Sequence, residues 1–556
     1  MSNTNKTVSE ATVKAAPVLT ITEEILKSID EFKENLRLYN EGKIENLKSF
    51  SSIMGIYKER LTETYMIRPR IPGGCITIEQ LRAISKIAKK YGENQIRFTT
   101  RQDVQFHSVK IDDLNNVLEE LIKADLTTKA AGGDGIRNVA CSPLSGVAVD
   151  EVFDVTPYMK AVANYMMEDP KNLKLPRKYK IAFSNSVKDT VNATITDIGF
   201  IAKIVDGKRG FEVYGAGGLG GGPRVGIKIE DFIDHNDALY YVQAMKQIFE
   251  REGDRANRHK ARLRFVLQRL GEEAFREMFK IELEKVRAEK DLTLNIENNV
   301  ENLEVTNTYN KKQLGKEYKN RMIVQKQCGY YSVYIHEQSG NMATKNLDSI
   351  LDLLETLDYK VSIRLTMTQG FFVRDLKEAD AERLIDFTSD FSSKFNIDNS
   401  VVCAGPKICK FGINNSQGLL KAIIETFKHE SFEIKNALPQ LLISGCQNSC
   451  AQPQKGIIGL IGKKKRTEDG LIPVYAILFN GKVGPGVAKF GEVYGEIAAK
   501  KIPDLFGDLA FLKVHSGYEE FEQFIENKEV EIRKLVDKYS ALESISERPD
   551  LYADFE

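Results

Sequence analysis

Ile96-Arg97-Phe98-Thr99, with Gln102 three residues further on, recurs as Ile363-Arg364-Leu365-Thr366 with Gln369. The two copies begin 267 residues apart. Self-similarity at a long, fixed offset is the sequence signature of a repeated structural unit. The stretch therefore indicates that the chain contains two copies of one folding unit.

Two further matches lie in the same order along the chain. Asn138-Val139-Ala140-Cys141 resembles Ser400-Val401-Val402-Cys403 at an offset of 262 residues, and Leu175-Pro176 matches Leu438-Pro439 at 263. Three similar offsets in one order imply a duplicated architecture. We predict a mixed α/β (α+β) fold in which each half contains a ferredoxin-like α+β module followed by a larger α/β module.

Local patterns set the expected boundaries. Thr77 and Gln80 form the capping-box signature of a helix that runs to about Lys90, and the segment from Ile96 to His107 reads as a strand. An Asn-rich stretch at 295–320 is typical of a linker. The expected units are a flexible tail and helix (1–50), a ferredoxin-like module (51–130), a larger module (131–294), the linker (295–320), a second ferredoxin-like module (321–395) and a second larger module (396–556).

Composition limits the classes of function. The 556 residues are 42% hydrophobic and 28% charged, which is typical of a globular protein. Lys plus Arg equals Asp plus Glu at 79 each, so no overall field favours nucleic acid. No apolar run is long enough to span a membrane, and the N-terminus lacks a signal pattern. We therefore expect a cytoplasmic protein with no nucleic-acid or membrane partner.

Four of the seven cysteines form two pairs, C-x5-C at Cys403 and Cys409, and C-x3-C at Cys446 and Cys450. Groups of four thiolates bind an iron–sulfur cluster or a tetrahedral zinc ion. Zinc ligands usually come in pairs separated by two to four residues, so the x5 spacing favours a [4Fe–4S] cluster. A zinc-stabilised binding protein is the alternative of a different class.

The cysteine pattern resembles that of the sulfite and nitrite reductases that hold a sirohaem coupled to a [4Fe–4S] cluster. The resemblance extends from about residue 53 to about residue 535. It implies that all four cysteines bind the cluster and that Cys450 also bridges to the sirohaem iron. It further implies reduction of a small anion, sulfite or nitrite, with electrons from an external donor.

The same resemblance implies a set of residues that bind the substrate anion. The matching stretches are Arg68-Pro-Arg-Ile-Pro-Gly-Gly, Arg137-Asn-Val and Leu-Pro-Arg-Lys178-Tyr-Lys180, which makes Arg68, Arg137, Lys178 and Lys180 the candidates. Several charge-assisted donors around one oxyanion bind it and stabilise developing negative charge. In a strand, Lys178 and Lys180 would point to the same face.

A second set is expected to bind the sirohaem, whose many carboxylates require fixed cations and amide donors. By resemblance, the macrocycle-binding strand contains Arg97, Arg101, Gln105 and His107. The basic segment Asn257 to Arg264, with Lys260 and Arg262, is a second candidate clamp, or else an ordinary basic helix surface. Asn448 is expected to donate near the cluster sulfurs.

At the 263-residue offset the two halves differ where chemistry is expected. Lys178 and Lys180 correspond to Leu441 and Ile443, while Phe183 and Val187 correspond to Cys446 and Cys450. By the earlier match, Cys141 is the vestigial counterpart of Cys403. One half therefore supplies cations where the other supplies cluster ligands, as expected for a cofactor between two related halves.

The sequence also leads to an expected substrate and an expected electron donor. Nitrite-reducing members of the family tend to have Asn where this chain has Lys180, so sulfite is the expected substrate and nitrite the alternative.

Gly215-Ala216-Gly217-Gly218-Leu219-Gly220 fits G-x-G-x-x-G, but a loop and a strand are expected to follow it and not a helix. With no flavin or nicotinamide site, electrons must come from ferredoxin or a separate flavoprotein reductase.

Overall fold

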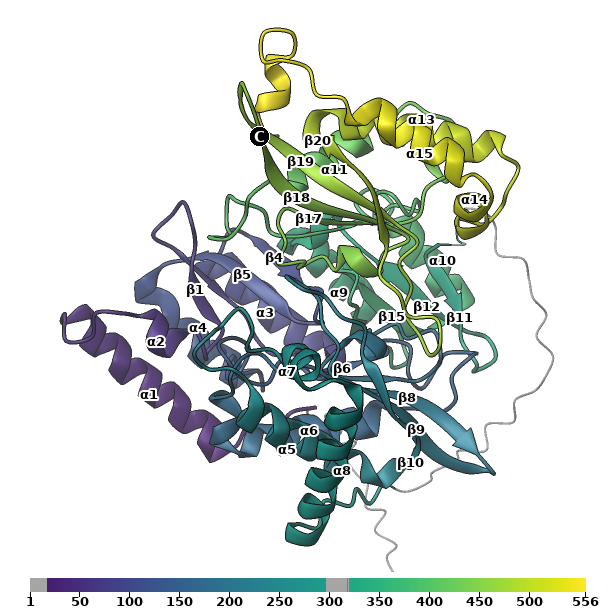
Figure 1. Cartoon of the computed structure of the whole chain (residues 1–556). Helices are drawn as coiled ribbons and strands as arrows, with labels where there is room; N and C mark the ends of the chain where they lie inside the picture. The colour runs from purple at the N-terminus through teal and green to yellow at the C-terminus, as the bar shows by residue number, and fades with distance from the viewer. Residues whose placement is uncertain (1–17, 297–317, 319) are drawn as a thin grey trace, which may run out of the picture.

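The computed structural model describes residues 18–296, 318 and 320–556. The first 17 residues of the predicted tail and most of the predicted linker at 295–320 lie outside the described residues. Within the described part, the strands form four five-stranded sheets, two for each half of the chain (Figure 1). No helix in these residues is both long and apolar enough to cross a bilayer.

The ferredoxin-like modules supply two of the sheets. Their strands are β1 Ile56–Lys58, β2 Tyr65–Ile67, β3 Cys75–Ile76, β4 Gln95–Phe98, β5 Val104–Val109, β11 Met322–Val324, β12 Tyr330–Ile335, β13 Asn341–Ala343, β14 Ser362–Leu365 and β15 Phe371–Lys377. The sheet orders are β1-β2-β5-β4-β13 and β11-β12-β15-β14-β3. Each sheet therefore takes its last strand from the other half, which joins the halves through backbone hydrogen bonds.

Helices of these two modules cover the sheets and share one hydrophobic core with both of them. They are α1 Glu23–Asn40, α2 Lys48–Ser51, α3 Ile78–Tyr91, α4 Leu114–Lys123, α9 Thr344–Glu355 and α10 Glu378–Phe387, with the 3-10 turns η1 Pro72–Gly74, η2 Ile111–Asp113 and η6 Gln338–Gly340. The capping box is confirmed, because Thr77 Oγ1 accepts from Gln80 N at 3.1 Å and Gln80 Oε1 accepts from Thr77 N at 3.2 Å. Two otherwise unpaired groups at the start of α3 are thereby satisfied.

The larger modules supply the other two sheets, with orders β10-β9-β8-β7-β6 and β16-β17-β18-β19-β20. These strands are β6 Ala140–Cys141, β7 Ile181–Ser184, β8 Ile198–Val205, β9 Lys208–Gly215, β10 Ile227–Asp234, β16 Val401–Val402, β17 Leu441–Ser444, β18 Ile458–Thr467, β19 Gly470–Phe479 and β20 Glu492–Ala498. In each sheet the three strands that come first in sequence pair in parallel and the remainder antiparallel. The predicted duplicated fold is confirmed.

Helices pack against these sheets on both halves. They are α5 Thr156–Glu168, α6 Ala238–Glu252, α7 Leu263–Leu270, α8 Glu272–Glu289, α11 Ser416–Phe427, α12 Phe432–Lys435, α13 Ile502–His515, α14 Phe521–Asn527 and α15 Glu529–Ser540, with the 3-10 turns η3 Pro170–Leu173, η4 Ala193–Ile195, η5 His235–Asp237, η7 Pro453–Lys455, η8 Ala499–Lys501 and η9 Pro549–Tyr552. In Figure 1 the C-terminal helices α13 and α15 lie at the top and α5, α6 and α8 at the bottom. The ferredoxin-like modules lie between them.

Two local predictions were wrong. The segment from Ile96 to His107 is not one strand but the hairpin β4–β5, because Gln102 takes a left-handed conformation (φ 59°) in the turn between them. Lys178 and Lys180 precede β7 and do not lie in it. The Gly-rich segment after β9 leads through a loop into β10, as expected, so it lacks the helix that a dinucleotide site requires.

The predicted register between the larger modules was also wrong. β7 and β17 begin 260 residues apart, and so do β8 and β18, whereas 263 was predicted from Leu175-Pro176 and Leu438-Pro439. The loops before these strands differ in length. The counterparts of Cys446 and Cys450 are therefore Ser186 and Thr190.

The counterpart of Cys403 changes for a similar reason. Ser142 N donates to Phe183 O as Cys403 N donates to Ile443 O, so Ser142 and not Cys141 corresponds to Cys403. Three thiols of one half thus have hydroxyl side chains as counterparts in the other half.

Candidate functional site

The four paired cysteines come together beyond the ends of β16 and β17. Cys403 lies directly after β16, and its Sγ is 3.1 Å from Ser416 Oγ and accepts from Gly445 N at 3.2 Å. Burial, together with negative charge on Cys403, Cys446 and Cys409, raises the pKa of Cys450 to about 11, although the charge of Lys178 opposes this. Such mutual effects require the four thiols to lie near one another.

Within the described residues, these thiols are not arranged as the ligands of one metal ion. In the described part of the chain, no three His, Cys, Asp or Glu side chains are arranged to hold one metal ion. A [4Fe–4S] cluster needs a wider set, because each cysteine binds a different iron. Burial raises the pKa of Cys446, and hydrogen bonds with Asn448 oppose this. Asn448 therefore lies where a donor to the cluster sulfurs was predicted.

The cysteine loop is fastened to the first half of the chain. Thr100 Oγ1 donates to Cys450 O at 2.7 Å, and Gln452 Nε2 donates to Thr100 O at 3.1 Å. Both bonds join the turn after β4 to the segment after Cys450. The β4–β5 hairpin therefore fixes the position of Cys450 relative to the cations of the first half.

Lys178 and Lys180 lie in a concentrated group of cations. Burial lowers the pKa of Lys178 to about 7, with further contributions from Arg137 and Arg262. Burial also lowers the pKa of Lys180 well below its usual range, with contributions from Arg101, Arg262 and Lys178. These ammonium groups are destabilised until an anion joins them, which is the electrostatic requirement of an anion site.

Arg68 and Arg137 belong to the same group. Arg68 donates from Nη1 to Ala131 O at 3.0 Å, and Arg137 donates from Nη2 to Gly133 O at 2.7 Å. Gln105 Oε1, in the orientation that pairs it with a donor, accepts from Arg68 Nη2 at 2.6 Å. Burial, with a contribution from the charge of Arg68, lowers the pKa of Arg137 to about 10. All four predicted anion-binding residues therefore lie in one electrostatically linked group.

Two buried carboxylates organise the cations, and the sequence analysis did not identify either. Asp197 Oδ2 accepts from Lys180 N at 2.9 Å and from Arg262 Nη2 at 2.7 Å. Burial raises the pKa of Asp103 to about 6, although Ile71 N and nearby arginines oppose this. Asp103 could have been singled out from the sequence, because it directly follows Gln102, the last residue of the repeated stretch. Asp197 lies in no motif that would have revealed it.

The arginines predicted for the cofactor are positioned by backbone carbonyls. Arg97 donates from Nη2 to Val402 O at 2.8 Å, and burial lowers its pKa to about 10 while Cys403 and Cys450 oppose this. Arg101 donates to Asn138 O at 3.0 Å and to Ile181 O at 2.7 Å. Arg97 thus lies beside the cysteines, and Arg101 lies beside the lysines.

Unpaired buried donors in the same region suit a ligand with many carboxylates. Arg262 Nε and Arg264 Nη1 are buried without a hydrogen-bond partner. Arg264 is otherwise held by Gly221 O and Gly222 O, each at 2.8 Å. Such donors cost free energy unless acceptors reach them, so the residues present fit the acidic rim of a sirohaem. Arg264 belongs with the predicted clamp, although only Lys260 and Arg262 were singled out there.

Two predicted residues are not brought to this group. His107 Nδ1 lies 2.7 Å from Glu59 Oε1, and no partner reaches its buried Nε2. Lys260 is exposed in the turn before α7. The segment Asn257 to Arg262 is not helical, so the interpretation as a basic helix surface was wrong. A role for His107 or Lys260 at the cofactor stays a prediction.

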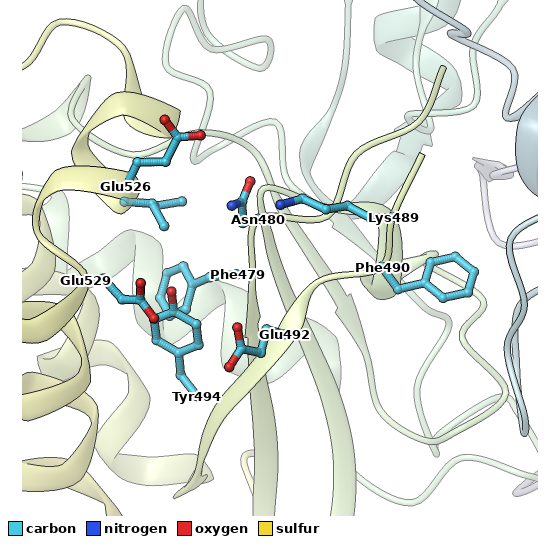
Figure 2. A pocket seen from close by; sticks show the side chains of 9 residues that line it. Phe479, Asn480, Lys489, Phe490, Glu492, Tyr494, Glu526 and Glu529 are labelled. Carbon is cyan, nitrogen blue, oxygen red and sulfur yellow. The ribbon is translucent and has the colours of Figure 1, made fainter. Parts of the chain in front are cut away.

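A cavity of about 290 Å³ lies elsewhere, between β19, β20 and the C-terminal helices (Figure 2). In Figure 2 Glu529 lies beside Tyr494, Glu526 lies apart from it on the side of Asn480, and the ring of Phe490 extends away from both glutamates. It contains none of the predicted site residues, and its carboxylates would repel an anion. This cavity is therefore a poor candidate for an anion site.

Comparison with known families agrees with the architecture. The profile described as "Nitrite/Sulfite reductase ferredoxin-like half domain" matches residues 57–124 and 323–387. The profile described as "Nitrite and sulphite reductase 4Fe-4S domain" matches residues 132–287. That second match covers the larger module that lacks the four cysteines, as a duplication of this module permits.

Individual relatives span most of the chain. A ferredoxin–nitrite reductase of Synechococcus elongatus is 28% identical over 474 residues, 82% of this chain and 88% of that protein. A sulfite reductase [ferredoxin] of Mycolicibacterium paratuberculosis is 23% identical over 415 residues, 73% of this chain and 71% of that protein.

Among solved structures, Mycobacterium tuberculosis NirA has the same fold, with a TM-score of 0.73, 22% identity, and coverage of 90% of this chain and 96% of that one. The two family profiles, the duplicated fold and the grouped cysteines agree. The chain belongs to the family of nitrite and sulfite reductases, oxidoreductases that hold a sirohaem and a [4Fe–4S] cluster.

Proposed function

We propose that this protein reduces sulfite to sulfide with electrons delivered by a ferredoxin. The observation that carries the proposal is the pair Lys178 and Lys180, two cations whose pKa values are lowered by burial and by neighbouring positive charges, with Arg262 among them for both. A doubly charged anion gains more from each of these cations than a singly charged one. The pair therefore favours sulfite over nitrite.

The proposed work of the protein residues is binding, orientation and proton supply. Arg68, Arg137, Lys178 and Lys180 would bind the sulfite oxygens and stabilise negative charge on them as they leave as water. Because the pKa of Lys178 lies at about 7, it can release and regain a proton at neutral pH. Asp197 would hold Lys180 and Arg262 in place through its two hydrogen bonds.

Cys403, Cys409, Cys446 and Cys450 would hold the cluster, and Cys450 would also join it to the sirohaem. Arg97, Arg101, Arg262 and Arg264 would pair with the carboxylates of the macrocycle. When bound, the two cofactors supply single-electron transfer to the substrate. Conversion of sulfite to sulfide takes six electrons by oxidation-state arithmetic, together with protons that yield three water molecules.

Reduction of nitrite to ammonia is the second candidate. It is favoured by the names of several relatives, which include an assimilatory ferredoxin-dependent nitrite reductase of Haloferax mediterranei, 25% identical over 501 residues. The names of the nitrite and sulfite reductases alike support ferredoxin as the donor. Nothing in the comparisons favours a flavoprotein reductase.

The proposal is tested by the electron stoichiometry. Anaerobically purified protein would be supplied with enzymatically reduced ferredoxin and limiting sulfite, and oxidised ferredoxin and sulfide would be quantified. The expected result is six ferredoxin electrons for each sulfide. Absence of sulfide, while nitrite is reduced to ammonia under the same conditions, would replace the proposal with its alternative.

A further inference from the structure

The second half contains a hollow of about 800 Å³, lined in part by the positions that the duplication relates to Arg70 and Arg137 of the first half. It is bounded by the segment after β12, by α10 with the segment that follows it, and by the approach to β16. The residues important here are His336, Asp386, Asp390, Ser392, Asp398 and Asn399. None of them has a role in the proposed reduction.

The register of the two ferredoxin-like modules identifies two counterparts. The turns η1 and η6 begin 266 residues apart, at Pro72 and Gln338, and each contains two positive φ angles at equivalent positions. Counting back from these turns, Tyr334 corresponds to Arg68 and His336 to Arg70. Two arginines of the first half are therefore replaced by uncharged rings in the second.

The strands β6 and β16 identify a third counterpart. Arg137 lies three residues before β6, and Asp398 lies three residues before β16. A cation of the substrate site is thus matched by a carboxylate in the hollow. At this position the first half has a positively charged side chain and the second half a negatively charged one.

His336 is the buried side chain from which we infer that a ligand binds here. It is 1% exposed, and burial, together with the charge of Arg97, lowers its pKa to about 4 against an opposing hydrogen bond to the Thr368 backbone, so its imidazole is neutral at pH 7. Tyr334 donates its hydroxyl hydrogen to Thr368 O at 3.1 Å, and its oxygen lies 3.4 Å from His336 Nδ1. With that hydroxyl hydrogen on Thr368, Nδ1 is the nitrogen that donates to the tyrosine oxygen, and Nε2 carries the lone pair.

That lone pair has no partner in the protein. Nε2 of His336 is buried without a hydrogen bond. An unsatisfied buried acceptor costs free energy, which a ligand N–H group would recover. A neutral imidazole nitrogen selects a hydrogen-bond donor and not an anion.

The charges around the hollow select the same class of ligand. Its described lining has four carboxylates, those of Glu337, Asp386, Asp390 and Asp398, and two cations, Arg321 and Lys394. Arg321 is already held by carbonyl oxygens, among them Ser392 O at 2.8 Å and Ile385 O at 3.2 Å. With four carboxylates against two cations, the described lining has a net negative charge, which favours a cation.

We propose that this hollow is a binding site for a small organic cation, whose N–H group donates to His336 Nε2 while Asp386, Asp390 and Asp398 balance its charge. The duplicated fold would then have one anion site and one cation site in related positions. Asp398 and Asn399 lie just before β16, which leads to Cys403, so bound ligand would contact the segment that precedes this cysteine. The proposal does not depend on which anion the enzyme reduces.

The test is calorimetric titration of the full-length holoprotein with 1,4-diaminobutane, beside the uncharged 1,4-butanediol. We expect saturable binding of the diamine and none of the diol. Asp386→Asn with Asp390→Asn, both exposed at the rim, should weaken diamine binding roughly tenfold, since each removes one favourable charge. Sulfite turnover should be unchanged in this double variant.

His336→Gln and His336→Phe separate the acceptor from the surrounding charge. Loss of diamine binding in the phenylalanine variant, with partial retention in the glutamine variant, would support His336 Nε2 as the acceptor. If His336→Phe does not fold, the rim double variant still decides the role of charge. Equal binding of diol and diamine, binding unaffected by all these variants, or no saturable heat at millimolar diamine would overturn the proposal.

Discussion

Gln102 and Gln369 hold equivalent positions and form matching bonds across the two halves. Gln102 Nε2 donates to Leu365 O at 2.9 Å, and Gln369 Nε2 donates to Phe98 O at 3.4 Å. Their Oε1 atoms accept from Cys141 N at 3.1 Å and from Val402 N at 2.8 Å. Both residues have a positive φ, 59° and 62°. Each glutamine thus ties its own turn to the opposite ferredoxin-like sheet and to the first strand of a larger module.

Replacement of Gln102 by Leu should destabilise this junction. The substitution leaves Cys141 N and Leu365 O buried without partners, at about 1–3 kcal/mol for each group. The midpoint of thermal unfolding, followed by circular dichroism, should therefore fall. Gln523→Leu, on the exposed face of α14, is the matched control and should leave the midpoint nearly unchanged. Equal midpoints for the two variants would show that the Gln102 bonds contribute little.

Replacement of any one of the four paired cysteines by Ser should reduce bound iron and acid-labile sulfide. Each thiol holds a separate iron, so one hydroxyl leaves the cluster with three strong ligands. Iron and sulfide analysis of anaerobically purified protein measures the loss. Cys328→Ser is the control, because Cys328 is exposed and outside the group. Full iron and sulfide in the Cys403→Ser variant would contradict the assignment of that ligand.

The contact between His107 and Glu59 should make stability depend on pH. Burial would raise the pKa of Glu59, but hydrogen bonds from His107, Thr64 and Ser108 N outweigh it and hold the pKa below the ordinary 4.5. The ionised carboxylate therefore stabilises the fold above pH 4.5, and this contribution is lost as the pH falls through the lower folded value.

Glu59→Gln removes that contribution. We expect a lower thermal midpoint than wild type at pH 7 and a difference that shrinks as the pH falls below 4.5. Scans across this range measure it, with exposed Glu63→Gln as the control. A difference that does not vary with pH would exclude ionisation of Glu59 as its cause.

Replacement of Lys180 by Asn should lower kcat/KM for sulfite more than for nitrite. Loss of a charge-assisted contact costs about 1.5–3 kcal/mol, roughly a ten- to hundredfold change, and a dianion loses more than a monoanion. Parallel turnover of both anions measures the ratio. Lys174→Asn, at an exposed position nearby, should leave it unchanged. An unaltered ratio in the Lys180 variant would remove the reason for preferring sulfite.

The duplication could be predicted from the sequence because a left-handed turn with buried hydrogen-bonding groups restricts which residue types can occupy it. Gln102 and Gln369 recur with their flanking tetrapeptides since both must fill the same left-handed turn and satisfy the same buried groups. The cysteine pairs were visible for a similar reason, because a cluster fixes the residue type at each ligand position.

Features created by tertiary contacts could not be predicted. Asp197 has no sequence signal, since its role depends on Arg262, which lies 65 residues away. The register of Cys446 and Cys450 was misjudged because Leu175-Pro176 and Leu438-Pro439 precede loops of different length. The exchange of β3 and β13 between sheets also leaves no local pattern, because the pairing partner lies in the other half.

The most direct test of the account is parallel turnover of sulfite and nitrite by the wild-type holoenzyme, prepared anaerobically and supplied with one chemical reductant, with sulfide and ammonia as products. The paired lysines predict a higher kcat/KM for sulfite. A higher kcat/KM for nitrite would contradict the proposed substrate and show that Lys178 and Lys180 do not set the choice between the two anions.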